Sequence, residues 1–228
     1  MSLRREVFIP AADAVSRLQN VLSGLGDLSV EDRVIGKDQQ EAAAILARVQ
    51  VVGGETTVKA ISAYLLEHAS AYLDLMFERA PLMQIKGHVD VVQHAIDSAL
   101  AEQTRWTQEM QRANVEGKMT PQLWDVLKGN FDVATKQFND KSAERQSLLL
   151  ELGRRQLTLL EHALHKMRAL AKMLPPMLLA VRDELEFSID KEAYLQLVEE
   201  ADKRSAKLSE EMLSRLAAHV EQSVRGTR

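Results

Sequence analysis

The feature that most limits how this chain can fold is an apolar stripe over residues 85–113, whose members alternate spacings of four and three. The stripe consists of Ile85, Val89, Val92, Ile96, Ala99, Gln103, Trp106, Met110 and Ala113. Gln103 is its single polar member. This heptad spacing predicts a long helix that packs against another helix, either in the same chain or in a second copy. We therefore expect the protein to self-associate.

Composition agrees with long helices. Of the 228 residues, 46% are hydrophobic, 27% are charged and only 4% are aromatic, a balance that favours helices over sheets and supplies enough apolar side chains for a core. No repeat of 20 to 50 residues is visible, which disfavours a solenoid. We predict an all-α protein, an elongated helical bundle or antiparallel coiled coil of five to seven helices, several of them long.

Several classes of protein are disfavoured. The absence of cysteine excludes disulfides and thiolate metal sites, and a net charge of −4 argues against nucleic acid as the main partner. The apolar run Met173–Val181 is far shorter than the roughly 20 residues that a membrane-spanning helix needs. The first residues, MSLRREVFIPAAD, do not have the apolar core of a signal peptide. We expect a soluble, cytoplasmic protein.

Helix signals divide the chain into an N-terminal arm with a short helix, residues 1–36, and a single helical bundle, residues 37–228. The first helix should begin near Pro10 and stop at the glycine loop that contains Gly24 and Gly26. A second helix should end before Gly53 and Gly54, and a third should end or kink at Pro81.

The later helices also have recognisable boundaries. Thr120 and Pro121 form a strong start signal for a helix that could run to Leu174. Residues 139–147, NDKSAERQS, are almost wholly polar, and they either continue this helix or form a turn. Continuity is favoured because this patch contains no Gly or Pro. The last long helix should be capped by Ser188 or Asp190.

Two consecutive prolines, Pro175 and Pro176, interrupt an apolar run and should break the helix that precedes them. Because the flanking residues are apolar on both sides, a buried corner is favoured. A hinge, or an apolar tip that touches a membrane, is the alternative interpretation.

No residue pattern points to a catalytic or metal centre. Glu161 and His165 lie one helical turn apart, but such a pair is more often a surface contact than a ligand set. Gly53 and Gly54 resemble a phosphate loop in miniature, yet the segment before them is helical and the P-loop pattern is missing. We expect neither enzymatic activity nor a cofactor.

Charge is distributed unevenly. Residues 141–172 contain seven Lys or Arg and three Glu, whereas residues 183–211 contain ten Asp or Glu and four Lys or Arg. These two segments could pack against each other with complementary faces. Alternatively, the basic helix could bind an acidic partner or a membrane surface. The residues that would then contact the partner are Arg154, Arg155, Lys166 and Arg168.

These features favour a non-enzymatic interaction or scaffold protein that acts through self-association or protein partners. The first alternative is a membrane-active helical protein, such as a pore-forming-toxin component or a membrane-remodelling coat, with the double proline at the tip of a hairpin. The second is a ligand-sensing bundle, which would need an apolar pocket with a few converging polar groups.

Overall fold

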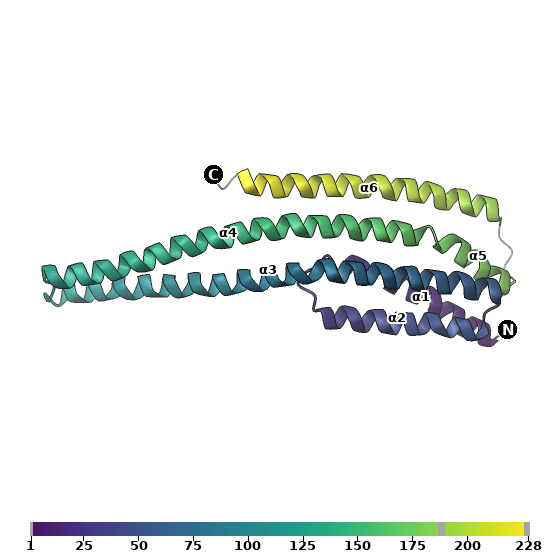
Figure 1. Ribbon diagram of the computed structural model, residues 1–228, viewed down its shortest axis with the longest axis horizontal. Coiled ribbons are helices and arrows are strands. Elements are labelled where there is room, and N and C mark those ends of the chain that lie inside the picture. The colour runs from purple at the N-terminus through teal and green to yellow at the C-terminus, as the bar shows by residue number, and fades with distance from the viewer. Residues whose placement is uncertain (1, 187–189, 226–228) are drawn as a thin grey trace. The chain divides into compact units, whose positions relative to one another are not determined.

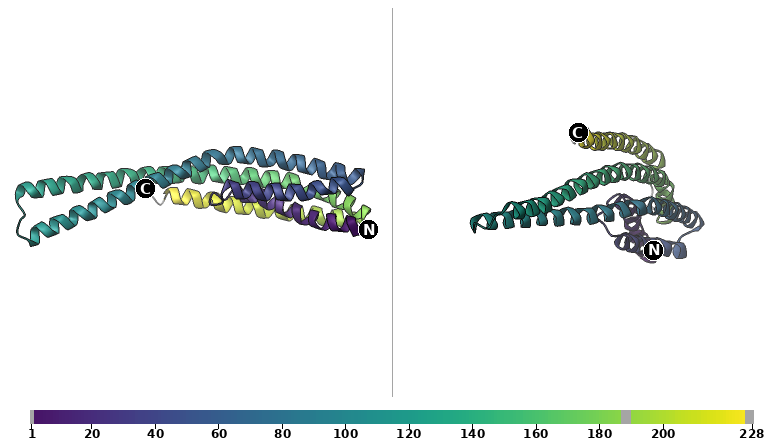
Figure 2. Two further views of the ribbon diagram at one scale, coloured as in Figure 1. Left: turned by 90° about the horizontal axis from the view of Figure 1, so that it is seen from below. Right: turned by 60° about the vertical axis from the view of Figure 1, so that its left-hand side comes forward.

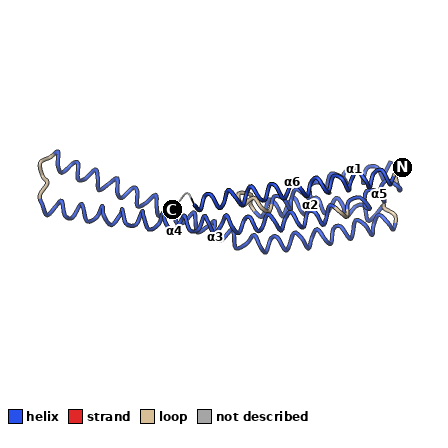
Figure 3. Tube along the Cα trace, turned by 90° about the horizontal axis from the view of Figure 1, so that it is seen from above, coloured by secondary structure: helices blue, strands red, loops and turns tan. Residues whose placement is uncertain are grey.

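The structure of the protein is a computed structural model, which describes residues 2–186 and 190–225 (Figure 1). Over these residues the chain forms six helices and no strand, which confirms the all-α prediction (Figure 3). The helices are α1 (Ser2–Gly24), α2 (Asp32–Val52), α3 (Glu55–Val115), α4 (Pro121–Ala171), α5 (Leu174–Glu184) and α6 (Lys191–Arg225).

The chain packs as two compact units. Unit 1 comprises residues 1–82 and 155–228, and unit 2 comprises residues 83–154. Both contain parts of α3 and α4, because each of these two helices runs through a unit boundary. Residues on both sides of position 36, the expected end of the N-terminal arm, belong to unit 1.

Unit 1 is a multi-helix bundle. The helices α1 and α2 pair with each other and lie along the first part of α3, while α6 lies along the last part of α4 (Figure 1, Figure 2). The leucine, isoleucine and valine side chains that are less than 2% exposed in this unit are Leu18, Leu22, Leu25, Leu46, Val49, Ile61, Leu75, Leu159 and Leu170. Burying such side chains is the main source of stability for a bundle.

A buried arginine ties the loop between α1 and α2 to α3. The Arg79 side chain is fully buried, and its Nε donates to Asp32 Oδ1 at 2.8 Å. Its Nη1 donates to the carbonyl oxygens of Leu25 and Asp27, and its Nη2 donates to that of Val30. Arg79 thereby satisfies three loop carbonyls and one carboxylate, the conditions under which a buried charge is tolerated.

Unit 2 is a helical hairpin made from the second part of α3 and the first part of α4. The apolar stripe over residues 85–113 packs against α4, with Gln103 Nε2 donating to Thr135 Oγ1 at 3.0 Å. The stripe is confirmed as a helix-packing seam, and its partner helix belongs to the same chain. The buried apolar side chains of this unit are Val89, Val92, Ile96, Ala99, Leu127 and Ala134.

The turn at the end of this hairpin follows its sequence signals. Gly117 adopts a positive φ of 64°, which side chains with a Cβ tolerate poorly, and the N–H of Lys118 bonds back to the Ala113 carbonyl. Thr120 Oγ1 then accepts from the N–H of Leu123 at 3.2 Å, and Pro121 occupies the first helical position. Thr120 is confirmed as the cap of α4.

The polar patch 139–147 lies inside α4, so the helix continues through it and the alternative of a turn is wrong. Side-chain pairs support the helix there. Lys141 Nζ lies 2.7 Å from Glu144 Oε2, and His88 Nε2 lies 3.3 Å from Glu144 Oε1. A polar stretch can stay helical when its side chains pair along and between helices in this way.

Two prolines lie inside helices that continue past them, so the predicted start near Pro10 and the predicted end at Pro81 are wrong. Helix α1 begins at Ser2 rather than near Pro10, and α3 continues through Pro81 to Val115. In both cases buried neighbours on either side hold the helix together: Phe8 and Ala11 around Pro10, and Arg79 and Leu82 around Pro81. Tertiary packing outweighs the cost of a proline within a helix at these positions.

The double proline forms a corner, but the break lies earlier than predicted. Helix α4 ends at Ala171 instead of Leu174, and Pro175 and Pro176 occupy the first turn of α5, where a missing N–H costs little. Pro175 and Met177 are buried, while Leu178 is half-buried.

For the last helix, α6, Asp190 is confirmed as the cap because its Oδ1 accepts from the N–H groups of Glu192 and Ala193. The other predicted cap, Ser188, lies outside the described residues.

Candidate functional site

An exposed, uncharged stripe runs along α3 in unit 1. Its members alternate spacings of three and four, and they are Ala63, Leu66, Ser70, Leu73, Phe77 and Ala80. All six are exposed, with Leu66 at 76%, Leu73 at 55% and Phe77 at 78%. We call this stripe the outer seam. Its spacing is that of a second heptad seam on the same helix.

The opposite face of α3 in unit 1 is already used for the core. Ile61, Tyr64, His68 and Leu75 are buried there, and His68 Nε2 donates to the Leu18 carbonyl at 2.9 Å. A helix that is apolar on two faces is stabilised when both faces pack against other elements, because each face otherwise exposes apolar surface to water. Single exposed leucines require no explanation, but a row of large apolar residues in heptad register marks an interaction surface.

Ion pairs between α3 and α4 border the outer seam on one side. His162 Nδ1 lies 2.8 Å from Glu78 Oε2, and Lys166 Nζ lies 2.6 Å from Asp74 Oδ2. The hydrogen bond to Asp74, together with the nearby carboxylates of Glu67 and Glu78, raises the pKa of Lys166 above its ordinary value. Lys166 is therefore held in its charged form at the edge of the outer seam.

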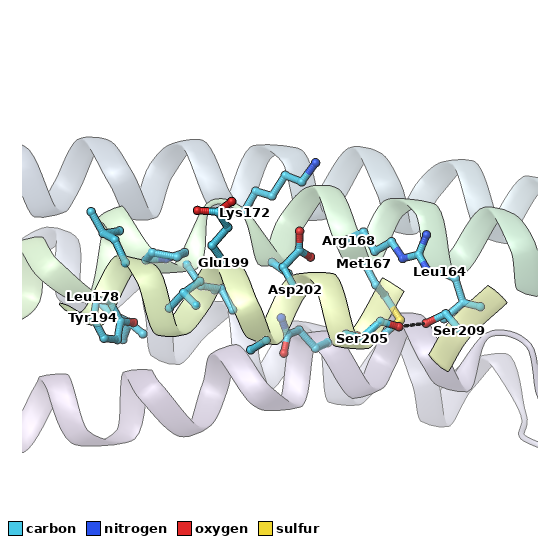
Figure 4. A pocket seen from close by; sticks show the side chains of 17 residues that line it. Leu164, Met167, Arg168, Lys172, Leu178, Tyr194, Glu199, Asp202, Ser205 and Ser209 are labelled. Atoms are coloured by element: carbon cyan, nitrogen blue, oxygen red, sulfur yellow. Dashed lines mark hydrogen bonds between the residues drawn. The ribbon is translucent and has the colours of Figure 1, made fainter. Parts of the chain in front are cut away.

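A groove of about 620 Å³ lies between α6 and the α4–α5 corner in unit 1 (Figure 4). Apolar side chains from all three helices form most of its wall. They are Leu164, Met167, Ala171, Leu174, Pro175, Leu178, Tyr194, Leu195, Val198 and Ala201. The groove therefore has the apolar lining that is typical of small-molecule sites.

A few polar groups also line this groove. Arg168 Nη2 donates to the Ala206 carbonyl at 2.7 Å, but its Nε is buried and has no hydrogen-bond partner. Asp202 lies on the α6 side of the same groove, and Lys172 and Glu199 also line it (Figure 4). A buried donor without an acceptor is uncommon in folded proteins.

The structure separates the basic residues that the sequence selected as partner contacts. Lys166 lies beside the outer seam, whereas Arg168 lines the groove. Arg154 and Arg155 are exposed, and they belong to unit 2 and unit 1, respectively. The hydrogen bonds of Lys166 and Arg168 thus run to different neighbours, α3 and α6, and the two residues do not form one basic face.

The loop at Gly53 and Gly54 joins two helices, as its sequence predicts, and the anion beside it comes from the protein itself. The N–H of Gly54 donates to Glu184 Oε1 at 2.7 Å, next to the first residue of α3. A carboxylate at this position is favoured by the positive end of the helix dipole. Glu184 thus occupies the place that a phosphate would take.

Comparison with known protein families, with curated proteins and with solved structures finds no match to this chain. Within the described residues, no helix is both long and apolar enough to cross a membrane. Over the same part of the chain, no group of three or more His, Asp or Glu side chains is arranged to hold a metal ion. Among the described residues, the outer seam and the groove both expose apolar side chains beside charged ones.

Proposed function

We propose that this protein is a non-enzymatic helical interaction protein and that it self-associates through the outer seam of α3. The observation that carries the proposal is the exposure of six uncharged residues in heptad register on a helix whose other face is buried. A cytoplasmic location and a homo-oligomeric state are parts of the same proposal.

The order of residues in the outer seam supports a second copy as the partner. In an antiparallel pairing about a two-fold axis between Ser70 and Leu73, Ala63 of one copy faces Ala80 of the other. Leu66 then faces Phe77, and Ser70 faces Leu73. Alanines meet at both ends, Leu66 meets Phe77 between them, and a serine meets a leucine at the centre. The patch therefore pairs with itself without placing two charges or two bulky ends against each other, as a two-fold interface requires.

The charged residues beside the outer seam are compatible with the same antiparallel pairing. Glu67 and Asp74 each follow a seam residue by one position, and an antiparallel arrangement brings Glu67 of one copy near Asp74 of the other. Two carboxylates would repel there, but Lys166 is bound to Asp74 in each copy. This lysine provides a cation between the two acidic groups, so Lys166 is the predicted contact residue that the proposal retains.

Sedimentation velocity over a range of protein concentrations tests the proposal. The unaltered protein should sediment as a dimer at high concentration, and Leu73→Glu should shift it to a monomer because a charge would be buried in the seam. Val51→Glu is the matched control, since Val51 is 85% exposed on α2 and lies outside the seam. It should leave the dimer intact.

A second variant tests the role of the lysine. Lys166→Glu should weaken the dimer, because Glu67 of one copy and Asp74 of the other would then lie close together without a cation between them. Lys207→Glu is the control. It is an exposed change on α6 and should leave the dimer intact. The proposal fails if the unaltered protein is a strict monomer at high concentration, or if Leu73→Glu and Val51→Glu dimerise equally well.

A further inference from the structure

We propose that dimerisation through the outer seam is pH-sensitive and that His162 and His165 are the groups that bind the protons. This inference rests on the proposed dimer and names how the same surface is regulated. Both histidines belong to α4 and are exposed, and they line a pocket of about 380 Å³ together with Phe77, a member of the outer seam. They therefore lie at the edge of the surface that a second copy would cover.

The charged groups around the two histidines are mostly carboxylates. Asp74 and Glu78 line the same pocket from α3, and His162 Nδ1 lies 2.8 Å from Glu78 Oε2. Lys166 of α4 supplies a cation, with its Nζ 2.6 Å from Asp74 Oδ2, and Glu67 of α3 is close enough to raise the pKa of this lysine. We call Glu67, Asp74, Glu78 and Lys166 the acidic edge.

Protonation of the two histidines changes the charge of this region. Three carboxylates and one lysine give the acidic edge a charge of −2, and two imidazolium groups beside it bring the sum to zero. Glu161, which lies one turn before His165 on α4, adds a further carboxylate beside the histidines. Mildly acidic pH therefore removes most of the negative charge from this side of the outer seam.

Pairing of two copies brings two acidic edges together. In the antiparallel arrangement, Glu67 of one copy lies near Asp74 of the other, and a single lysine per copy does not balance the carboxylates. The carboxylates of the second copy favour the charged form of each imidazole. The dimer therefore binds protons more tightly than the monomer does, and by linkage its dissociation constant should fall as the pH drops.

Histidines are the side chains that change charge between about pH 8 and about pH 6, since carboxylates and lysines at ordinary positions stay ionised over this range. His68 also belongs to unit 1, but it is buried on the opposite face of α3 from the outer seam. Its effect is on folding, so measurements of helix content separate it from an effect on dimerisation.

Sedimentation velocity at about pH 8 and about pH 6 provides the test, with helix content measured in the same samples. The dissociation constant of the dimer should be about tenfold lower at the lower pH, because four exposed histidines in the dimer each contribute a weak ion pair. In about 1 M salt the difference should largely disappear, since salt screens exposed charges.

Two variants identify the proton-binding groups. The double variant His162→Gln, His165→Gln is neutral at these positions at both pH values and should lose most of the pH dependence, whereas His94→Gln, an exposed change in unit 2, should keep it. His162→Lys keeps a cation at both pH values and should tighten the dimer at the higher pH. His94→Lys is its matched control and should not.

The outcomes separate this inference from the dimer itself. Equal dissociation constants at both pH values, in a protein that does dimerise, would overturn the pH sensitivity and leave the proposed dimer standing. A pH dependence that survives the double variant in full would show that other groups bind the protons. A strict monomer at both pH values would overturn the dimer and the inference together.

Discussion

Units 1 and 2 are built from the same two helices, α3 and α4, yet they bury their side chains to different extents. In unit 1, Leu75 of α3 and Leu170 of α4 are completely buried. In unit 2, the aromatic side chains of Trp106, Phe131 and Phe138 are only half-buried. Unit 1 has four further helices to cover these two, whereas unit 2 consists of α3 and α4 alone.

The difference shows what a heptad pattern does and does not determine. A two-helix hairpin can cover one stripe on each helix, so the large side chains at the edges of that stripe remain partly in water. Adding helices completes the core, but it can also leave a new apolar face outside, as the outer seam of α3 shows. Unit 2 should therefore be the less stable unit, and unit 1 should be the unit that binds a second copy.

The largest expected effect is the loss of Arg79, because it acts at the centre of unit 1. Arg79→Met would leave the carbonyls of Leu25, Asp27 and Val30 without this donor and Asp32 without its ion pair. Asp32 is 47% exposed and can be hydrated, but each carbonyl left without its donor costs about 1 to 3 kcal/mol, so the three together should cost at least about 3 kcal/mol. Chemical denaturation should show a loss of this size in the free energy of unfolding of unit 1.

The control for this variant lies in unit 2. Arg105 is exposed and its guanidinium stacks on Trp106 at 4.2 Å from the ring centroid. Arg105→Met should change stability by no more than about 1 kcal/mol. If the two arginine variants lose similar amounts, the buried network of unit 1 does not stabilise it in the way that its geometry indicates.

Leucine-to-alanine variants compare the two cores directly. Leu75→Ala in unit 1 should cost about 2 to 5 kcal/mol, because a completely buried site in a multi-helix core cannot collapse around the cavity. The loss in free energy of unfolding for Leu127→Ala in unit 2 should lie at or below the lower end of this range, because a two-helix hairpin can close around the cavity more easily. Hydrogen exchange of peptides from each unit measures both losses, and equal values would contradict the comparison.

The pH dependence of unit 1 should depend on His68. Burial lowers the pKa of His68 below its ordinary value of 6.5, although the hydrogen bond to the Leu18 carbonyl partly opposes this. The unfolded chain therefore takes up a proton at a higher pH than the folded protein does. Stability should be complete above about pH 6.5 and should fall as the pH drops towards the lower pKa of folded His68.

Thermal unfolding between neutral and mildly acidic pH measures this effect. His68→Gln should flatten the pH dependence, whereas His94→Gln, at an exposed position in unit 2, should leave it unchanged. A pH profile of His68→Gln that matches the unaltered protein would show that other groups cause the acid sensitivity.

Much of the fold could be predicted from local patterns. The seam over residues 85–113, the cap at Thr120 and the cap at Asp190 depend on spacing and on residues within a few positions of each other, which the sequence displays directly. Pro10 and Pro81 were poor guides to helix boundaries. Whether a helix continues through them depends on the burial of Phe8 and Arg79 beside them, and that burial depends on distant segments of the chain.

The candidate surfaces were harder to predict. The alternating spacing from Ala63 to Ala80 is visible in the sequence, but which of two apolar stripes on α3 faces outward depends on where α1 and α2 pack. Nothing local distinguishes Arg79 from an exposed arginine, since its acceptors lie about 50 positions away. The groove depends on the packing of α6 against α4 and α5, which spacing alone does not specify.

The smallest expected effects concern two glycines of unit 2, and they have opposite signs. Gly117 has a φ of 64°, and an alanine there would have to adopt the same left-handed conformation, at a cost of about 1 to 2 kcal/mol. Gly129 lies inside α4, and beyond the adjacent residues and the backbone of its own helix an added Cβ would meet no atom within 4 Å. Gly129→Ala should therefore stabilise the helix by about 0.5 to 1 kcal/mol.

Because both glycines belong to the hairpin, their effects should appear in the hydrogen exchange of residues 83–154 and leave the slowest-exchanging amides of unit 1 unchanged. A Gly117→Ala variant that stabilises the hairpin would show that the turn does not require the left-handed conformation. Equal changes in both units would show that α3 and α4 transmit stability along their length, so that the two units unfold as one.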